Sequence, residues 1–419
     1  MTWTIANPAR QVSLFSLLAV TSLGYFVDGY DLIIFSVVRK ASIIDLGLAS
    51  TEEQIKNIGI GLENWQSAGL LLGGIIWGIL GDKLGRIKIL YGSIAIYSIA
   101  NFANGFLSPE WGNVYTWYAA LRLLSGFGLA GELGAGITLA SEAMATNKRG
   151  YGSMAIAGIG LLGFVTAAWL GSLNVFKWNT LFIIGGVAGF VLLLFRVGIY
   201  ESSVYLLQRR ASVARGSFFS LFTNRTRFRK FMLCILVGLP MFFVIGLPIK
   251  FASNMARAFG IEGVSVPTAL ITFYLALALG DVLCIYLSQK LKSRKKPLLL
   301  FNILNLIIVL AFIFLQPANA NQYHYIYCPL LGLSVGYWAM LTTNAAEQFG
   351  TNLRATVAVS VPNFVRASFI PIALLFTSIE TTLGTIYSAA IVGVACSLVG
   401  IISTVFTEET FNKNLDYAE

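Results

Sequence analysis

Long apolar runs separated by short polar segments recur along the whole chain. A helix needs roughly 20 apolar residues to cross a bilayer, and an open strand cannot satisfy its backbone hydrogen bonds in lipid. The pattern therefore predicts an all-α membrane protein with twelve transmembrane helices. The expected spans are residues 12–38, 64–80, 89–107, 115–140, 152–173, 180–198, 231–251, 266–288, 298–315, 325–345, 357–378 and 383–406.

The amino-acid composition argues against several classes of protein. Of the 419 residues, 57% are hydrophobic and only 11% are charged, less than a soluble domain needs to cover its surface. A single histidine and four isolated cysteines argue against a metal site or a disulfide framework. The sequence has no GxxxxGK[ST] loop for ATP and no nucleophile–base set. We therefore expect neither an enzyme nor a bound cofactor, and a proton gradient as the energy source.

The distribution of charge gives an orientation. The net charge is +10, and most Lys and Arg residues fall in the loops that share a side with both termini. Positively charged loops stay in the cytoplasm, so both termini are expected there. The excess charge then needs no nucleic acid as a partner. The bias fits a multi-pass protein of a bacterial inner membrane, although a eukaryotic organelle is not excluded.

A repeated polar segment divides the chain into related halves. Glu142 to Arg149 follows the fourth expected span, and Glu347 to Arg354 follows the tenth, with Glu, Thr, Asn and Arg at matching positions. Such repeats are typical of transporters. We expect two pseudo-symmetric six-helix bundles, residues 1–200 and 231–419, joined by a basic cytoplasmic linker, residues 201–230.

The loop after the second span carries the most specific motif, Gly78-Ile-Leu-Gly81-Asp82-Lys-Leu-Gly-Arg86-Ile-Lys88. It resembles the signature loop of the major facilitator superfamily, and the resemblance extends over all twelve spans. It implies that Gly81, Asp82 and Arg86 latch the outward-open state. The corresponding loop of the second half has Gln289 in the place of the acid, which puts a second latch in doubt.

The repeated segments after spans four and ten also resemble the charges that close the cytoplasmic side in this superfamily. The resemblance implies that Glu142, Arg149, Glu347 and Arg354 join the halves there. Helix capping and topology are the alternative roles for these four residues.

The first span contains two acids, Asp28 and Asp31. Acids inside a span are costly and indicate function, and residues three apart share a helix face. The Asp-Gly-x-Asp motif resembles that of the superfamily's aromatic-acid-type metabolite:proton symporters, which implies a role in proton coupling. Asp28 could instead partner a buried arginine, and Asp31 could be solvated near the outer surface.

The fourth span contains Arg122 in an Arg-x-x-x-Gly-x-Gly motif and Glu132 ten residues later. A buried Arg needs a counter-charge, and Asp28 or Asp31 is the obvious candidate. The resemblance implies proton transfer or anchoring of the first span for Arg122. Glu132 is either a second protonation site, part of the cytoplasmic gate, or a structural polar contact.

Arg366 lies deep in the eleventh span. A cation near the midplane of a half with few acids suggests an anionic substrate group, unless Asp281 neutralises it. Lys250 is a weaker candidate for the same task, and Pro240 and Pro248 predict a broken seventh helix. Further candidates for the substrate site are Gln66, Asn101, Tyr274, Tyr337, Trp338, Asn344 and Asn363.

The sequence thus predicts a monomeric secondary transporter working by alternating access in the lipid bilayer. We expect proton-coupled uptake of a small polar metabolite that carries a carboxylate. A proton-driven exporter, an importer of a polycarboxylate siderophore and a non-transporting sensor are the alternatives. The sequence names neither the substrate nor the stoichiometry.

Overall fold

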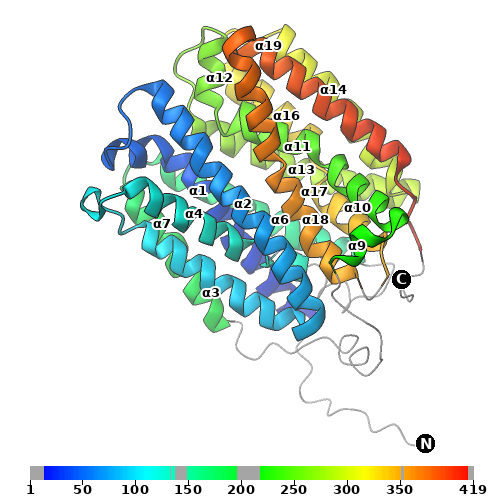
Figure 1. Cartoon of the computed structure of the whole chain (residues 1–419). Helices are drawn as coiled ribbons and strands as arrows, with labels where there is room; N and C mark the ends of the chain where they lie inside the picture. The colour runs from blue at the N-terminus through cyan, green and yellow to red at the C-terminus, as the bar shows by residue number, and fades with distance from the viewer. Residues whose placement is uncertain (1–13, 133, 137–148, 196–217, 351–352, 414–419) are drawn as a thin grey trace, which may run out of the picture.

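The computed structural model describes residues 14–132, 134–136, 149–195, 218–350 and 353–413, which form helices joined by turns and no strand (Figure 1). The elements before residue 196 are α1 (Leu14–Asp45), α2 (Glu52–Leu84), α3 (Arg86–Asn104), η2 (Pro109–Trp111), α4 (Val114–Leu129), α6 (Arg149–Ser172) and α7 (Trp178–Phe195). The rest are α9 (Ser220–Thr223), α10 (Arg225–Val237), α11 (Leu239–Val244), η4 (Ile245–Ile249), α12 (Ala252–Ala258), α13 (Val266–Leu291), α14 (Lys295–Phe314), α15 (Ala320–Gln322), η5 (Tyr323–Tyr327), α16 (Cys328–Ser334), α17 (Trp338–Glu347), α18 (Arg354–Ala367) and α19 (Phe369–Phe406).

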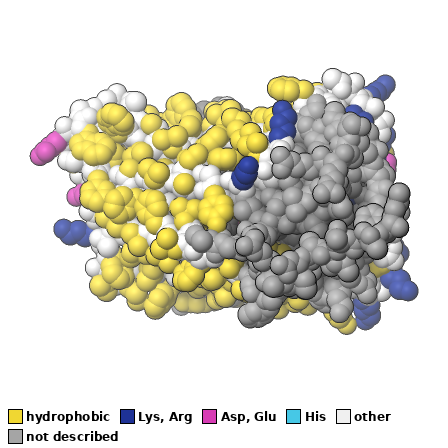
Figure 2. Space-filling model, turned by 90° about the horizontal axis from the view of Figure 1, so that it is seen from below, with side chains coloured by type: hydrophobic (Ala, Val, Ile, Leu, Met, Phe, Trp, Pro, Cys, Tyr) yellow, Lys and Arg dark blue, Asp and Glu magenta, His cyan; other side chains and the backbone are white. Residues whose placement is uncertain are grey.

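Eight described segments are long and apolar enough to cross a membrane. The segment Thr356–Phe406 has 51 residues, about twice what one span needs. It turns at Gly384, whose φ of 76° lies outside the helical region, and so it supplies two spans. With α2, α3 and α4, the expected twelve transmembrane helices are present. Hydrophobic side chains cover much of the surface on one side in Figure 2.

The second span begins earlier than the apolar pattern indicated. α2 starts at Glu52 rather than near Asn64, because Thr51 and Gln54 form a capping box there. Such a box satisfies backbone N–H groups that the first turn of a helix leaves unpaired. The extra turns carry Glu63 into the helix. α2 ends at Gly85, where a φ of 105° suits glycine and allows α3 to follow at once.

Close helix packing depends on glycine. α1 packs along most of α6, and a Cβ at Gly163 of α6 would collide with the backbone oxygen of Phe26 on α1. α2 and α4 approach in the same way, since a Cβ at Gly126 would strike the backbone oxygen of Gln66. Small residues at such crossings let the backbones pack closely, which replaces the hydrophobic drive that lipid removes.

The seventh and tenth spans are broken, as the prolines predict for the seventh. α10, α11 and the single π-helical turn η4 follow one another, and Pro248 lies inside η4. The tenth span also contains a π-helical turn, η5, and Tyr323 of η5 donates to the backbone oxygen of Pro248 at 2.5 Å. A side chain at the break in the tenth span thus satisfies a backbone oxygen at the break in the seventh.

The helices before and after residues 196–217 meet mainly through α2 with α18 and through α6 with α13 (Figure 1). We call these two sets of helices the N-terminal and C-terminal halves. The division at 1–200, 201–230 and 231–419 remains a prediction, since residues 196–217 lie outside the described part. The last residues of the expected linker belong to α10, which begins at Arg225.

Gly163→Ala should lower the thermal stability of the detergent-purified protein. The added methyl group must displace the α1 backbone, and overpacking of this kind costs about 1–3 kcal/mol. Gly158→Ala on the same helix is the matched control, because a Cβ there meets nothing within 4 Å. Unfolding followed by tryptophan fluorescence should show a lower Tm for Gly163→Ala only; equal Tm values would contradict the close approach.

Candidate functional site

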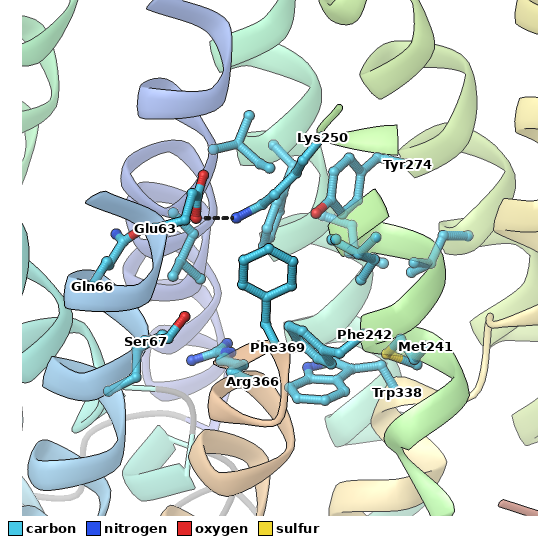
Figure 3. Close-up of a pocket in the computed structure, with 18 of the residues that line it drawn as sticks. Glu63, Gln66, Ser67, Met241, Phe242, Lys250, Tyr274, Trp338, Arg366 and Phe369 are labelled. Atoms are coloured by element: carbon cyan, nitrogen blue, oxygen red, sulfur yellow. Dashed lines mark hydrogen bonds and ion pairs between the residues drawn. The ribbon is translucent and has the colours of Figure 1, made fainter. Parts of the chain in front are cut away.

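A cavity lies between the two halves, with a volume of about 670 Å³ including its mouth (Figure 3). Helices α1, α2 and α6 line it on one side, and α11, η4, α13, α17, α18 and α19 on the other. Its enclosed part has a volume of about 60 Å³, which holds a few water molecules. Of the predicted substrate residues, Gln66, Lys250, Tyr274, Trp338 and Arg366 line this cavity.

One ion pair crosses between the halves at the upper end of the cavity in Figure 3. Lys250 Nζ lies 2.8 Å from Glu63 Oε2, and Ser36 donates to Glu63 Oε1 at 2.9 Å. Lys250 is the residue directly after the π-helical turn η4, so the broken helix directs it into the cavity. Lys250 is therefore already paired in this state, and it is not free to bind an anion.

Glu63 was missed by the sequence prediction. The apolar pattern placed the second span at residue 64, which left Glu63 outside the membrane. The carboxylate is only 1% exposed, and a buried charge is tolerated only with a partner. The capping box at Thr51 was the available signal that α2 begins earlier and includes this acid.

A second ion pair between the halves involves Arg366, which lies below Glu63 and Lys250 in Figure 3. Arg366 Nη2 is 4.0 Å from Asp28 Oδ2, and both side chains are almost fully buried. Arg366 also donates to Asn363 at 3.2 Å and lies over the Trp338 ring at 5.4 Å. Since 4.0 Å is at the limit of ion pairing, Arg366 is only loosely held by Asp28. The prediction of an unpaired Arg366 is thus wrong, and its partner is Asp28 rather than Asp281.

The breaks in the tenth and eleventh spans position this lower pair. Asp281 of α13 accepts from the backbone N–H of Ala339 at 3.0 Å and so caps the start of α17. This places Trp338, the first residue of α17, at the cavity. Arg366 lies one residue before the end of α18, which stops at Ala367. Asp281 therefore has a structural role that the sequence left open.

Arg122 has a different environment from the one expected. It donates to Gln66 Oε1 and lies over the Phe35 ring at 4.4 Å. Gln66 lines the cavity, so Arg122 reaches the cavity through Gln66. Of the two expected counter-charges for Arg122, Asp28 pairs with Arg366 instead. The other candidate, Asp31, lies close enough to interact electrostatically with Arg122.

The predicted intramembrane acids are buried, and none of them lines the cavity; Asp28 is connected to it through Arg366. Asp31 is 0% exposed, and its Oδ1 would collide with a Cβ at Gly185 of α7. The alternative of a solvated Asp31 is thus wrong. Glu132, beyond the end of α4, is 1% exposed, which excludes a solvated position for it as well.

Four predicted substrate residues are engaged elsewhere. Their hydrogen bonds serve helix packing, and they do not line the cavity. Ser125 donates to Asn101, Tyr337 donates to the Val237 oxygen, Thr410 donates to Asn344, and Asn363 donates to the Ala130 oxygen. Of these four residues, only Asn363 is connected to the cavity, because it accepts a hydrogen bond from Arg366.

Aromatic rings form much of the remaining wall. Phe164 of α6 stacks on Tyr274 of α13, with ring centroids 4.4 Å apart, and so joins the two halves. Tyr25 meets Phe164 edge to face at 6.3 Å, and Phe242 lies 5.9 Å from Trp338. Such faces suit a flat apolar group held beside the charged residues. Of these rings, the sequence predicted only Tyr274 and Trp338.

Contacts between the halves close the space above the cavity. Arg257 pairs with Glu52 at 3.0 Å, and Lys56 pairs with Glu380 at 2.6 Å. The hydrogen bond from Lys40 outweighs partial burial and, together with Arg257, holds the pKa of Glu52 below its usual range. Glu52 is therefore ionised and available for both cations at neutral pH.

The halves also touch below the cavity. Thr356 of α18 donates to the Gly78 oxygen of α2 at 3.4 Å, and Asn363 of α18 donates to the Ala130 oxygen at 2.7 Å. Among the described residues, the two halves are therefore held together both above and below the cavity.

Comparison with known proteins identifies the family. A family model described as the Major Facilitator Superfamily matches residues 21–367. The chain belongs to the major facilitator superfamily. The structure of the proton:xylose symporter XylE bound to 6-bromo-6-deoxy-D-glucose superposes with a TM-score of 0.74, at 15% identity, over 98% of each chain. The twelve-helix fold of the superfamily is thus shown for this multi-pass membrane protein.

Curated relatives of this superfamily protein are transporters. The niacin transporter NiaP of Acinetobacter baylyi is 26% identical over 81% of each chain. The cis,cis-muconate transport protein of the same organism is 23% identical over 97% of this chain and 95% of the relative. Two other relatives match over only 46% and 47% of their own length.

The superfamily's signature loop is only partly described here. Gly81 is buried in α2, and a Cβ there would approach Ile89 to 2.8 Å. The side chains of Asp82, Arg86 and Arg149, and all of Glu142, lie outside the described residues. Their proposed latch and gate roles remain predictions.

Among the described residues, Glu347 pairs with a cation of its own half. Arg294 donates to both of its oxygens, at 3.0 and 3.1 Å. Its expected partners, Glu142 and the Arg149 side chain, lie outside the described residues, so the gating role of Glu347 remains a prediction. Arg354, at the start of α18, is 8% exposed.

Glu409, which the sequence analysis did not single out, binds the loop that leads into α14. Glu409 accepts from the backbone N–H groups of Arg294 and Lys295 at 2.7 and 3.4 Å, and from the Ser293 hydroxyl. Although partial burial raises the pKa of Glu409, these hydrogen bonds outweigh it and place the pKa below its usual range. A carboxylate thus stabilises the start of α14.

Lys250→Met should destabilise the protein strongly, because it leaves the Glu63 carboxylate buried without a cation. Breaking a buried pair in this way costs about 3–5 kcal/mol. The double variant Glu63→Gln/Lys250→Met should recover most of the lost Tm. Thermal unfolding of the two single variants and the double variant measures the coupling; additive losses would show that the pair is not what stabilises this end of the cavity.

Proposed function

We propose that this protein takes up a small carboxylate together with protons by alternating access. The observation that carries the proposal is Arg366, which faces the cavity and is loosely paired with Asp28 across the halves. Arg presents a planar fork that fits a carboxylate through two hydrogen bonds. In the low dielectric of the midplane, the substrate carboxylate and the Asp28 carboxylate compete for the Arg366 guanidinium.

Charge balance couples the proton to the substrate. The two cross-half pairs, Asp28 with Arg366 and Glu63 with Lys250, leave the cavity neutral. A substrate carboxylate adds one negative charge, which is costly in a buried site. A proton on Asp28 removes that excess and releases Arg366 for the substrate. Each carboxylate thus brings at least one proton with it.

The wall of the cavity favours a flat or unsaturated acid. The stacked Phe164 and Tyr274 and the ring of Trp338 offer apolar faces within the same cavity as Arg366. Niacin and cis,cis-muconate, the compounds named for two relatives, are small carboxylates with planar skeletons. The substrate class proposed here is therefore a small, planar organic acid.

The proposal also includes the orientation, location, oligomeric state and energy source of the protein. We place both termini in the cytoplasm of a bacterial inner membrane, on the basic bias of the loops. The lower end of the molecule in Figure 1 is then cytoplasmic. The protein works as a monomer, with residues 1–200 and 231–419 as its two bundles, and it uses the proton gradient without a cofactor.

Arg366→Ala should weaken carboxylate binding by at least about thirtyfold, since truncating a buried charge partner costs 2 kcal/mol or more. We would screen purified protein by thermal shift against planar acids and their neutral amides. Arg366→Lys should bind with intermediate affinity. Arg257→Ala, which removes a partly exposed arginine of the same half, should bind as the unmodified protein does. Stabilisation by amides alone would overturn the carboxylate proposal.

Asp28→Asn should abolish accumulation driven by a proton gradient while it preserves counterflow exchange. The amide cannot bind the coupling proton, but it also leaves Arg366 free for substrate. Asp45→Asn is the control on the same helix, because Asp45 lies at the end of α1 and accepts from Trp178 at 2.7 Å. Flux and counterflow would be measured in proteoliposomes. Equal loss of both would assign Asp28 a structural role.

A further inference from the structure

A second cavity lies at the lower end of the molecule, apart from the cavity between the halves. It has a volume of about 740 Å³ including its mouth, between the start of α10 and the end of α19. Three cations line it, Arg225, Arg229 and Lys230, against a single acid, Glu408. No part of the transport mechanism above uses this cavity.

The cations lie at the end of a helix where they are least favourable. α10 begins at Arg225 and has no acid in its first turn, although the positive end of a helix favours anions and disfavours cations. Lys230 pairs with Glu408 at 3.3 Å, but the Glu408 side chain is 55% exposed. Asn224 caps the backbone N–H groups of Thr226 and Arg227. Among the described lining residues, the one carboxylate, which is solvated, does not balance the three cations. The cavity therefore has an unmet preference for an anion.

Exposed aromatic side chains lie in this cavity and on the helices that form it. Phe222 of α9 and Phe228 of α10 contact each other and are 46% and 41% exposed, although they do not line the cavity. Phe406, at the end of α19, lines the cavity, is 57% exposed and lies under the Arg229 guanidinium at 5.8 Å. Aromatic and cationic side chains occur together in this way at the headgroup level of a membrane.

We propose that this cavity binds the phosphate headgroup of an anionic phospholipid in the cytoplasmic leaflet. Arg225 and Arg229 would bind the phosphate oxygens, with Lys230 adding a third charge. The acyl chains would lie against Phe222, Phe228 and Phe406. A soluble phosphate would satisfy the cations alone and leave the aromatic surface unexplained. The assignment of the leaflet depends on the orientation proposed above, and the site itself does not.

The position of the cavity gives the lipid a route to the transport cavity. The seventh span begins with α10 at this cavity and continues through α11 and η4 to Lys250, the residue that pairs with Glu63. A lipid that holds the start of α10 would thus restrain the helix that carries one side of the upper ion pair.

Thermal shift of the full chain in detergent, with added dioleoyl phosphatidylglycerol or dioleoyl phosphatidylcholine, tests the site. Phosphatidylglycerol should raise the Tm more than phosphatidylcholine does. Arg225→Gln/Arg229→Gln should reduce the affinity for phosphatidylglycerol by about fivefold for each charge removed. Arg227→Gln is the matched control, because Arg227 belongs to the same helical turn but does not line the cavity.

Three results would overturn the proposal. Equal loss in Arg227→Gln would show general charge attraction, an equal shift with inorganic phosphate would show a soluble ligand, and equal shifts with both lipids would show no headgroup preference. If the double variant does not fold, Arg229→Gln alone supplies the same comparison. An unchanged carboxylate shift at the transport cavity would separate this result from failure of the proposed function.

Discussion

Neutrality of the buried charges is the constraint on which the rest of this structure depends. Each acid at the transport cavity is paired with a cation from the opposite half: Glu63 with Lys250 and Asp28 with Arg366. Because uncompensated charge in a low-dielectric interior is so costly, the halves cannot separate freely while both pairs are intact. The same two pairs therefore hold the halves together around the cavity.

Irregular helices make this pairing possible. The π-helical turn η4 places Lys250 at the cavity, the capped start of α17 places Trp338 there, and α18 stops directly after Arg366. Regular helices would continue past these points. Irregular backbone is tolerated inside a membrane only where protein or a cavity surrounds it, so the breaks occur where the C-terminal half faces the N-terminal half.

The two pairs differ in strength, and the difference has a functional meaning. Glu63 and Lys250 are at 2.8 Å with a supporting hydrogen bond from Ser36, whereas Asp28 and Arg366 are at 4.0 Å. The loose pair faces the aromatic wall where a solute would bind. The tight pair is nearer the contacts of Glu52 and Glu380 with cations of the opposite half. In the proposed mechanism, binding and closure are thus separated along one cavity.

The sequence by itself determined the membrane fold, because apolar length is set by bilayer thickness and is legible residue by residue. It also identified Asp28 and Arg366, since charge within a span is conspicuous. It did not reveal that they partner each other, that Glu63 is buried against Lys250, or that Glu409 binds the start of α14. Those facts join residues far apart in the chain. Only tertiary packing decides such pairings, because the partner of a buried charge is set by which helices meet.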